Sequence, residues 1–216
     1  MYKVDLHTHS IMSPDGSISE KDYRQVLDSK KLDFIAITDH NTIEFAQKLQ
    51  GKLGEKIIVG EEITTLEGDI IGLFLTEKIA PGLTLKEAIL GIHRQKGLVY
   101  VPHPFDKLRQ GIGGKAFLKY RKEIDIIEGF NARMIVRGYN AKAQEVVRKY
   151  SLPMGAGSDA HTKYGLGSAY VLVDEPFIRK NAITLLQNAY FHLHYQPFWA
   201  FLTPKINKLK QKARIK

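Results

Sequence analysis

The sequence predicts an α/β fold with a largely parallel sheet of the β/α barrel type. Two observations favour this fold class. Short apolar runs alternate with amphipathic stretches along most of the chain, a pattern typical of parallel strands covered by helices. Several of these runs are followed at once by a histidine or an acid, and the carboxyl ends of barrel strands share one face of the molecule. The chain of 216 residues has the length of a single domain.

The expected strands and helices follow from the spacing of the apolar residues. Eight short β-rich runs predict strands, at residues 2–6, 34–37, 57–59, 70–75, 98–101, 124–127, 154–156 and 170–173. Amphipathic stretches predict helices at residues 19–29, 43–53, 84–95, 140–149 and 177–190. Ser19 can cap the first helix, and Thr84 with Glu87 forms a capping box for the third. Gly97 ends that helix before the next strand.

Two segments stand outside this alternation. Residues 106–115 combine three glycines with Lys107, Arg109 and Lys115, and we expect a cationic surface loop there. Residues 191–203 are unusually aromatic, and residues 204–216 hold six Lys and Arg side chains and no acid. We therefore divide the chain into a main domain of residues 1–190 and an extension of residues 191–216, aromatic and then basic, which packs on the domain or trails from it.

The composition narrows the function. The chain has no cysteine, which excludes disulfides, thiolate metal sites and a cysteine nucleophile. Its formal net charge is +9, a balance that favours phosphorylated or polyanionic partners. No run approaches about 18 apolar residues, so we expect no membrane span. The first residues lack the basic start and apolar run of a signal peptide, and we expect a cytoplasmic protein. The sequence does not indicate an oligomeric state.

The chemistry is expected at the ends of the predicted strands. His7 and His9 follow the first strand, and alternate residues of an extended backbone point to the same side. Later strands are followed by further histidines and acids: Asp39 with His40, Glu61 with Glu62, His103, and Asp159 with His161. Imidazole and carboxylate groups are ligands of manganese, iron and zinc. This repetition therefore predicts a metal site at one face of the barrel.

Six motifs resemble, in the same order, those of the PHP (polymerase and histidinol phosphatase) domain proteins, a family of metal-dependent phosphoesterases. They are DLHTHS at residues 5–10, SPDG at 13–16, ITDHN at 37–41, GEEIT at 60–64, HPF at 103–105 and GSDAH at 157–161. The resemblance covers nearly the whole chain up to about the last strand. It implies a distorted (β/α)7 barrel with a metal site at the carboxyl ends of the strands, and makes residues 1–190 a catalytic domain.

The resemblance also implies two or three divalent metal ions, of manganese, iron or zinc. The implied ligands are His7, His9, Glu62 and Asp159 for one ion, Glu62 with His103 for a second, and Asp15, His40 and His161 for a third. Glu62, and not Glu61, is expected to be the bridging acid.

Three further positions are expected to support the site. Between the last two motifs the family often supplies another ligand, for which Asn131 and Glu128 are the candidates, and Asn131 aligns better. Asp39 is expected to orient a neighbouring histidine and not to bind metal itself. Arg133 is expected to bind a substrate phosphate, because its planar guanidinium matches phosphate oxygens.

The expected activity is hydrolysis of a small phosphate ester, such as a nucleotide, a nucleoside bisphosphate or a sugar phosphate, by a metal-activated hydroxide. Asp159 and His161 are the candidate catalytic residues, because either could pass a proton to the leaving oxygen. The positive charge favours exonuclease-like hydrolysis of short RNA or DNA as the alternative, although the chain has no basic stripe with interleaved aromatic residues. Two further hypotheses are a non-catalytic metal-binding partner protein and a carbon–nitrogen hydrolase.

Overall fold

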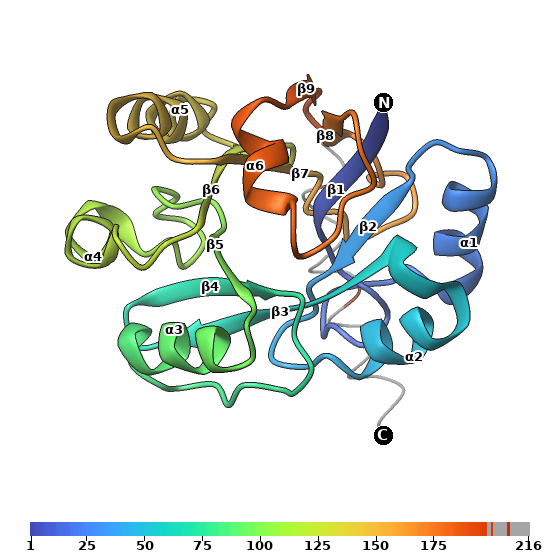
Figure 1. The fold of residues 1–216 in the computed structure, drawn as a ribbon, viewed down its shortest axis with the longest axis horizontal. Helices are drawn as coiled ribbons and strands as arrows, with labels where there is room; N and C mark the ends of the chain where they lie inside the picture. Colours follow the sequence, from blue (N-terminus) through green and yellow to red (C-terminus); the bar gives the residue numbers. More distant parts are fainter. Residues whose placement is uncertain (198–199, 201–206, 208–216) are drawn as a thin grey trace.

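The computed structural model describes residues 1–197, 200 and 207. In this part of the chain, one nine-stranded sheet has the strand order β7-β6-β5-β4-β3-β2-β1-β8-β9 (Figure 1). The strands are β1 (Tyr2–Thr8), β2 (Phe34–Ile37), β3 (Ile57–Thr65), β4 (Gly68–Leu73), β5 (Leu98–Val101), β6 (Ile126–Asn131), β7 (Met154–Gly157), β8 (Ala169–Val173) and β9 (Tyr190–Leu193). The helices are α1 (Glu20–Asp28), α2 (Glu44–Leu53), the short 3-10 helix η1 (Gly54–Lys56), α3 (Leu85–Arg94), α4 (Gly113–Tyr120), α5 (Gly138–Tyr150) and α6 (Ala182–Gln187).

The sheet curls into a nearly closed, distorted barrel, as the sequence predicts. Strands β1 to β7 are neighbours in sequence order. The two ends of this series meet where Thr8 forms a parallel bridge with Ala160, and the amide of His9 donates to the Ala160 carbonyl at 2.9 Å. The first half of β1 pairs with β8 instead. The barrel is therefore closed only at the carboxyl end of β1, where the predicted site begins.

The expectation of a largely parallel sheet is wrong at β4 and also at β8, which is antiparallel to β1 and β9. The change of direction at β4 matters most for the site. This strand is antiparallel to both β3 and β5, whereas β1–β3 and β5–β7 pair in parallel. The predicted strand at residues 57–59 continues to Thr65 and turns directly into β4 without a helix. Because β4 runs the other way, its beginning and not its end lies at the face that carries the strand ends.

The core has two clusters of buried side chains, one on each face of the sheet. Ile35 and Ile57 pack with α1, α2 and α3, whereas Ala36 and Ile58 belong to the cluster that includes Leu186 of α6. Strands buried on both faces read as continuous apolar runs, and burial of each large aliphatic side chain contributes about 1.5–3 kcal/mol. The apolar runs of the sequence therefore form the buried strands of the barrel, and these strands position the residues at their ends.

The helix boundaries agree with the sequence in part. Capping boxes at Ser19 and Thr84 begin α1 and α3, as predicted. The predicted surface loop at residues 106–115 ends in α4, which begins at Gly113. The predicted helix at residues 177–190 is shorter, because α6 ends at Gln187 and the chain then forms β9. The predicted strand at residues 124–127 is β6, which continues to Asn131.

The described part of the C-terminal extension lies on the barrel. Strand β9 pairs with β8, and the Tyr195 ring packs on Phe130 with a centroid distance of 4.8 Å. The amide of Gln196 donates to the Ala132 carbonyl at 2.8 Å. The aromatic residues 198, 199 and 201 and the basic residues lie outside the described residues, and the division of the chain at residue 190 stays a prediction.

Among the described residues, no helix has the length and apolar character needed to cross a membrane. The cytoplasmic location stays a prediction.

Candidate metal centre

Glu62 lies at the centre of the predicted site, in contact with four histidines. Its Oε2 atom is 3.5 Å from His7 Nε2, 3.2 Å from His9 Nε2 and 3.3 Å from His40 Nδ1. Its Oε1 atom is 3.1 Å from His103 Nε2. The carboxylate is buried, and it comes from the part of β3 that pairs with β4. One carboxylate thus faces imidazoles that come from three other parts of the barrel wall.

Asp159 contacts two of the same histidines, His7 and His9, and also His161. Its Oδ1 atom is 3.8 Å from His7 Nε2, 3.5 Å from His9 Nε2 and 3.4 Å from His161 Nδ1. The amide of Asp159 donates to the carbonyl of His7 at 2.7 Å. The segment after β7 is therefore bonded directly to β1, and the first and last of the six motifs meet.

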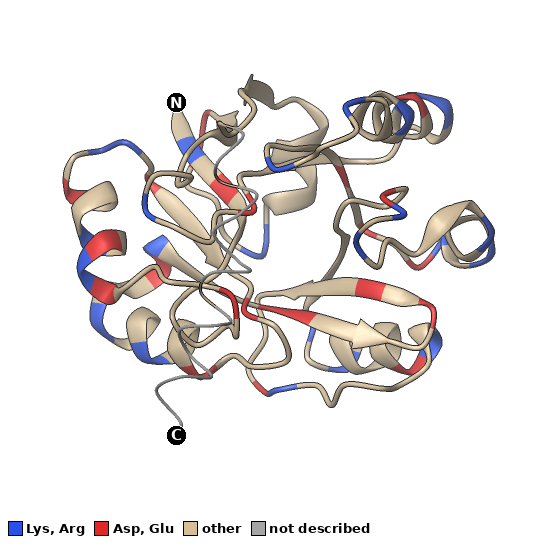
Figure 2. Cartoon of the chain, turned by 180° about the vertical axis from the view of Figure 1, so that it is seen from behind, with Lys and Arg blue, Asp and Glu red and all other residues tan. Residues whose placement is uncertain are grey.

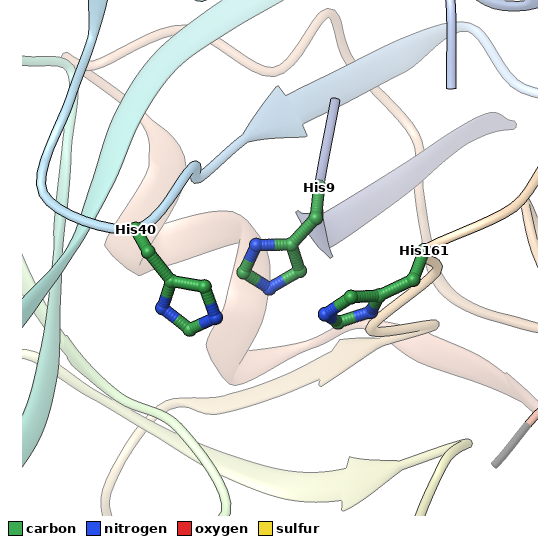
Figure 3. A group of neighbouring side chains, drawn as sticks. All are labelled: His9, His40 and His161. Carbon is green, nitrogen blue, oxygen red and sulfur yellow. The ribbon is translucent and has the colours of Figure 1, made fainter. Parts of the chain in front are cut away.

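A third group joins three histidines from three motifs. Figure 3 shows the rings of His40, His9 and His161 side by side, with His9 in the middle. The His9 ring centroid is 4.6 Å from that of His40 and 4.2 Å from that of His161. Asp15 Oδ1 is 3.7 Å from His40 Nε2 and 3.4 Å from His161 Nε2. The turn that carries Asp15 therefore places a carboxylate against two of these rings.

The donor chemistry of these side chains fits divalent metal ions. Three sets of three side chains offer ligand atoms that lie within 4.8 Å of one another. The sets are His9 with His40 and His161, His7 with Glu62 and His103, and His7 with His9 and Asp159. Nitrogen and carboxylate oxygen donors without sulfur suit manganese, iron and zinc. Because the sets share members, they form one continuous candidate centre.

The buried charges of this centre depend on one another. Burial acts to lower the pKa of His7, but the carboxylates around it, Asp159 foremost, hold that pKa well above its ordinary value. Burial acts to raise the pKa of Glu62, but His40 and His7 hold that pKa well below its ordinary range. A bound cation would replace the proton that His7 carries, so metal binding and deprotonation are coupled.

Glu128 connects the wall of the barrel to the histidines. Its Oε1 atom is 3.0 Å from His7 Nδ1 and accepts a hydrogen bond from the Tyr100 hydroxyl at 2.9 Å. Its Oε2 atom accepts from the His103 amide at 2.7 Å and from Asn131 Nδ2 at 2.9 Å. Both oxygens are therefore occupied by donors of the chain. A carboxylate on Nδ1 leaves Nε2 of His7 as the nitrogen that faces the centre.

Asn131 lies in the site, but its side-chain oxygen also has partners. Its Nδ2 atom donates to Asp159 Oδ2 at 3.2 Å as well as to Glu128. Its Oδ1 atom accepts from the Arg133 amide at 2.9 Å. The structure brings Asn131 and Glu128 together and gives Glu128 the orienting contacts. The expected role of Asn131 as a metal ligand stays a prediction.

Asp39 reaches the histidines through a serine. Its carboxylate accepts from the Ser10 amide and hydroxyl, both at 2.6 Å, and from the Ser13 hydroxyl at 2.9 Å. The Ser13 oxygen is 3.1 Å from His9 Nδ1 and accepts from the His40 amide at 3.1 Å. Asp39 therefore fixes a hydroxyl that contacts both histidines, the arrangement expected of an orienting acid.

Two arginines meet at Asp159. Arg133 lies 3.2 Å from Asp159 Oδ1 and 3.0 Å from His161 Nδ1, and Arg109 donates to Asp159 Oδ2. Arg109 also donates from Nε to Asp106 at 2.9 Å. Burial, followed by the charge of Arg133, lowers the pKa of His161 to about 3, so this ring is neutral. Sequence reasoning placed Arg109 in a surface loop, although its position soon after a strand-end histidine was the signal that could have identified it.

The candidate centre lies in a cavity of about 470 Å³. The cavity is lined by the predicted residues His9, Asp15, His40, Glu62, His103, Arg133, Asp159 and His161. Sequence reasoning missed Asp69 and Arg109 among its lining residues. Asp69 gave no signal, because it stands at the beginning of an antiparallel strand and not at a strand end. Leu108 and Ile135 also line the cavity, although both are largely exposed.

The backbone is strained or tightly packed at three positions around the centre. His103 and Asp159 adopt positive φ angles of 29° and 51°, which non-glycine residues adopt uncommonly. A Cβ atom at Gly157 would lie 2.4 Å from His7 Cβ and 2.7 Å from Glu128 Oε1. Strand β7 can therefore approach β1 only with glycine at this position.

A distorted barrel that carries this donor set at its strand ends defines the class of metal-dependent hydrolases. Within this class, the chain belongs to the PHP domain family. The model of the PHP domain matches residues 5–151, and a model described as PHP-associated matches residues 137–183. The family resemblance of the six motifs is thereby confirmed.

Related proteins and folds agree with this membership. The chain is 40% identical over 185 residues to the uncharacterized protein MJ0417 of Methanocaldococcus jannaschii. This match covers 82% of the chain and 73% of the relative. The fold of the chain is similar to that of a two-domain protein of Bacteroides vulgatus described as containing a predicted PHP-like metal-dependent phosphoesterase. The TM-score is 0.68 at 20% identity, and the match covers 96% of this chain and 69% of the other. The fold is also similar to that of the lesion-specific endonuclease PfuEndoQ of Pyrococcus furiosus, with a TM-score of 0.61, 17% identity and coverage of 85% and 56%.

Proposed function

We propose that the protein is a metal-dependent phosphoesterase that hydrolyses a small phosphate ester. The observation that carries this proposal is the pair Arg109 and Arg133, which come from two loops and meet at Asp159 beside the histidines. Guanidinium groups bind phosphoryl oxygens with two parallel hydrogen bonds. The cavity of about 470 Å³ has the size of a small-molecule site.

Two or three divalent ions of manganese, iron or zinc would be held by the histidines and acids of the centre: His7, His9, Asp15, His40, Glu62, His103, Asp159 and His161, with Asn131 beside them. When bound, such ions activate water as a nucleophile and neutralise charge on the phosphoryl oxygens. Glu128 and Asp39 hold the imidazoles in place through hydrogen bonds. Arg133 binds and orients the phosphate, and Arg109 flanks it from the other loop. His161 and Asp159 adjoin Arg133 and are the predicted residues for proton transfer.

The mouth of the cavity favours a nucleotide or nucleoside bisphosphate over a sugar phosphate. Leu108 is 66% exposed and Ile135 is 56% exposed, and both line the cavity. Each stands within two residues of one of the two arginines. An apolar wall next to a phosphate-binding group suits a ligand with a flat apolar part, whereas a sugar offers hydroxyl groups that need polar partners.

Hydrolysis of short RNA or DNA is the second candidate. The Asn207 side chain donates to the Asp15 carbonyl at 2.9 Å, and five Lys and Arg side chains follow this residue in the sequence. The fold is also similar to that of an endonuclease. Elsewhere, Lys and Arg are spread over the outer helices α1, α4 and α5, with acids among them on α1 and α5 (Figure 2). This spread supports a small substrate, because a strand of nucleic acid needs a continuous basic track.

The test is phosphate release from nucleoside monophosphates and bisphosphates, sugar phosphates and short oligonucleotides by the manganese-loaded protein. Glu62→Gln should abolish release, and Arg133→Ala should strongly reduce it at substrate concentrations below KM. Arg121→Ala, at the exposed arginine that directly follows α4, should leave release unchanged. The best substrate distinguishes the two candidates. Bound manganese without release from any phosphate ester would refute the proposal and favour carbon–nitrogen hydrolysis or a non-catalytic partner role.

A further inference from the structure

Asp69 is a buried acid of the cavity that no motif contains. It is the second residue of β4, whose antiparallel direction brings the beginning of this strand beside Thr64 near the end of β3. Asp69 lines the same cavity as Glu62, His103 and Arg109. Only 6% of the residue is exposed. A carboxyl group therefore points into the candidate centre from a strand that runs antiparallel to both of its neighbours and does not present its carboxyl end there.

The backbone of Asp69 is held in place by the loop that carries Arg109. The amide of Asp69 donates to the Gln110 carbonyl at 2.6 Å. The preceding Gly68 has a φ angle of 132°, and a Cβ atom there would lie 2.7 Å from the same carbonyl oxygen. The beginning of β4 and the arginine loop thus approach too closely for any other residue at position 68, and the position of Asp69 is fixed relative to the arginine.

One oxygen of Asp69 has no hydrogen-bond partner among the described residues. Its Oδ1 atom is buried and makes no hydrogen bond with any described residue. An ionised carboxylate without a partner is costly in a buried site. A proton on this buried carboxyl group removes that cost, and its hydroxyl can then donate to a group that enters the cavity.

Asp159, by contrast, has no carboxylate oxygen without a hydrogen-bond donor. Its Oδ1 atom accepts from Arg133, and its Oδ2 atom accepts from Arg109 and Asn131. A carboxylate whose two oxygens accept three hydrogen bonds is an acceptor and has no proton to give. The proton for the leaving oxygen can therefore come from the predicted His161, whose Nδ1 lies 3.0 Å from Arg133, or from another group that lines the cavity.

We propose that Asp69 is a catalytic residue that protonates the leaving oxygen of the substrate. As water adds its oxygen to phosphorus and the bond to the leaving oxygen breaks, the Asp69 proton moves to that oxygen. The products are an alcohol and phosphate, and the Asp69 carboxylate regains a proton derived from the attacking water. This inference rests on the proposed phosphoesterase function and adds a residue to it.

The experiment compares Asp69→Asn with the wild-type protein on phosphate esters whose leaving groups differ in acidity, all with manganese. Nitrophenyl phosphate has an acidic leaving group and needs little help from a proton donor, whereas a nucleoside monophosphate has a basic one. We expect Asp69→Asn to lose about 10²-fold or more in kcat on the nucleoside monophosphate, the usual effect of a general acid. Its loss on nitrophenyl phosphate should be much smaller.

Glu61→Gln is the matched control. Glu61 is also buried on the β3–β4 hairpin with one oxygen that lacks a partner among the described residues, but its other oxygen accepts from the Ile79 amide and it does not line the cavity. This variant should show the wild-type dependence on the leaving group. Bound manganese is measured in all proteins, because loss of metal in Asp69→Asn would make Asp69 a ligand and overturn the proposal. Equal losses on both substrates would also overturn it and leave the phosphoesterase function intact. A wild-type protein inactive on both would overturn both proposals.

Discussion

Substitution of Glu128 by glutamine should separate the orienting contacts from the metal ligands. Each oxygen of Glu128 accepts two hydrogen bonds, from His7 and Tyr100 at Oε1 and from His103 and Asn131 at Oε2. In Glu128→Gln one of the two oxygens becomes an amino group, which faces two donors and can accept from neither. At the Oε2 position this amino group loses the hydrogen bonds from the His103 amide and Asn131. At the Oε1 position it loses that from protonated His7, whereas the Tyr100 hydroxyl can turn to accept from it. At least one of the four hydrogen bonds is therefore lost, whichever way the amide is turned.

The magnitude follows from this count. A hydrogen bond to a buried charged group contributes about 1.5–3 kcal/mol, so the free energy of unfolding should fall by at least about 1.5–3 kcal/mol. That is a large part of the about 5–15 kcal/mol that stabilises an ordinary domain. Loss of the carboxylate behind a metal-binding histidine typically weakens metal binding about 10–100-fold. Both effects are expected because Glu128 holds His7 and the His103 backbone together.

The measurements are urea denaturation of the metal-free protein and calorimetric titration with manganese. Asp125→Asn is the control, because Asp125 accepts from the Val99 amide at the other end of the same strands, away from the cavity. It should leave manganese affinity unchanged. Tyr100→Phe, which removes a single hydrogen bond to Glu128, gives a milder variant if Glu128→Gln does not fold. Wild-type manganese affinity in both Glu128→Gln and Tyr100→Phe would refute the orienting role.

Four other predictions follow from the structure. Arg133→Ala should raise KM for a phosphate ester by about tenfold or more, since a charged hydrogen bond is lost, and steady-state kinetics at fixed manganese measure this. Leu108→Ser and Ile135→Ser should raise KM for nucleotides but not for glycerol phosphate; equal effects would argue against the apolar wall. Manganese should raise the melting temperature and a chelator should lower it, and titrations in buffers of different ionisation enthalpy should detect protons released as His7 loses its proton. Burial raises the pKa of Glu61 from 4.5 to about 7, so the folded state binds this proton more tightly than the unfolded chain, and stability should fall as pH rises between these values. Glu61→Gln should remove up to about 3 kcal/mol of this dependence, measured by denaturation at pH 4 and pH 8.

The sequence by itself determined the fold class and most of the candidate centre. Apolar runs followed by histidines and acids are a local pattern, and parallel strands bring their carboxyl ends together whatever the details of packing. For this reason His7, His40, His103 and His161, which lie far apart in the chain, could be predicted to meet. Capping boxes at Ser19 and Thr84 are also local, because each involves residues only three positions apart.

The tertiary structure decided the features that depend on pairing between distant segments. The direction of β4 is fixed by its hydrogen bonds to β3 and β5, and only that direction places Asp69 in the cavity. Arg109 belongs to a loop whose sequence resembles any cationic surface loop, and its role emerges from contact with Asp159, fifty residues later. Alignment favoured Asn131 over Glu128, and both are on β6. Only the folded barrel shows that both oxygens of Glu128 accept hydrogen bonds from neighbouring residues.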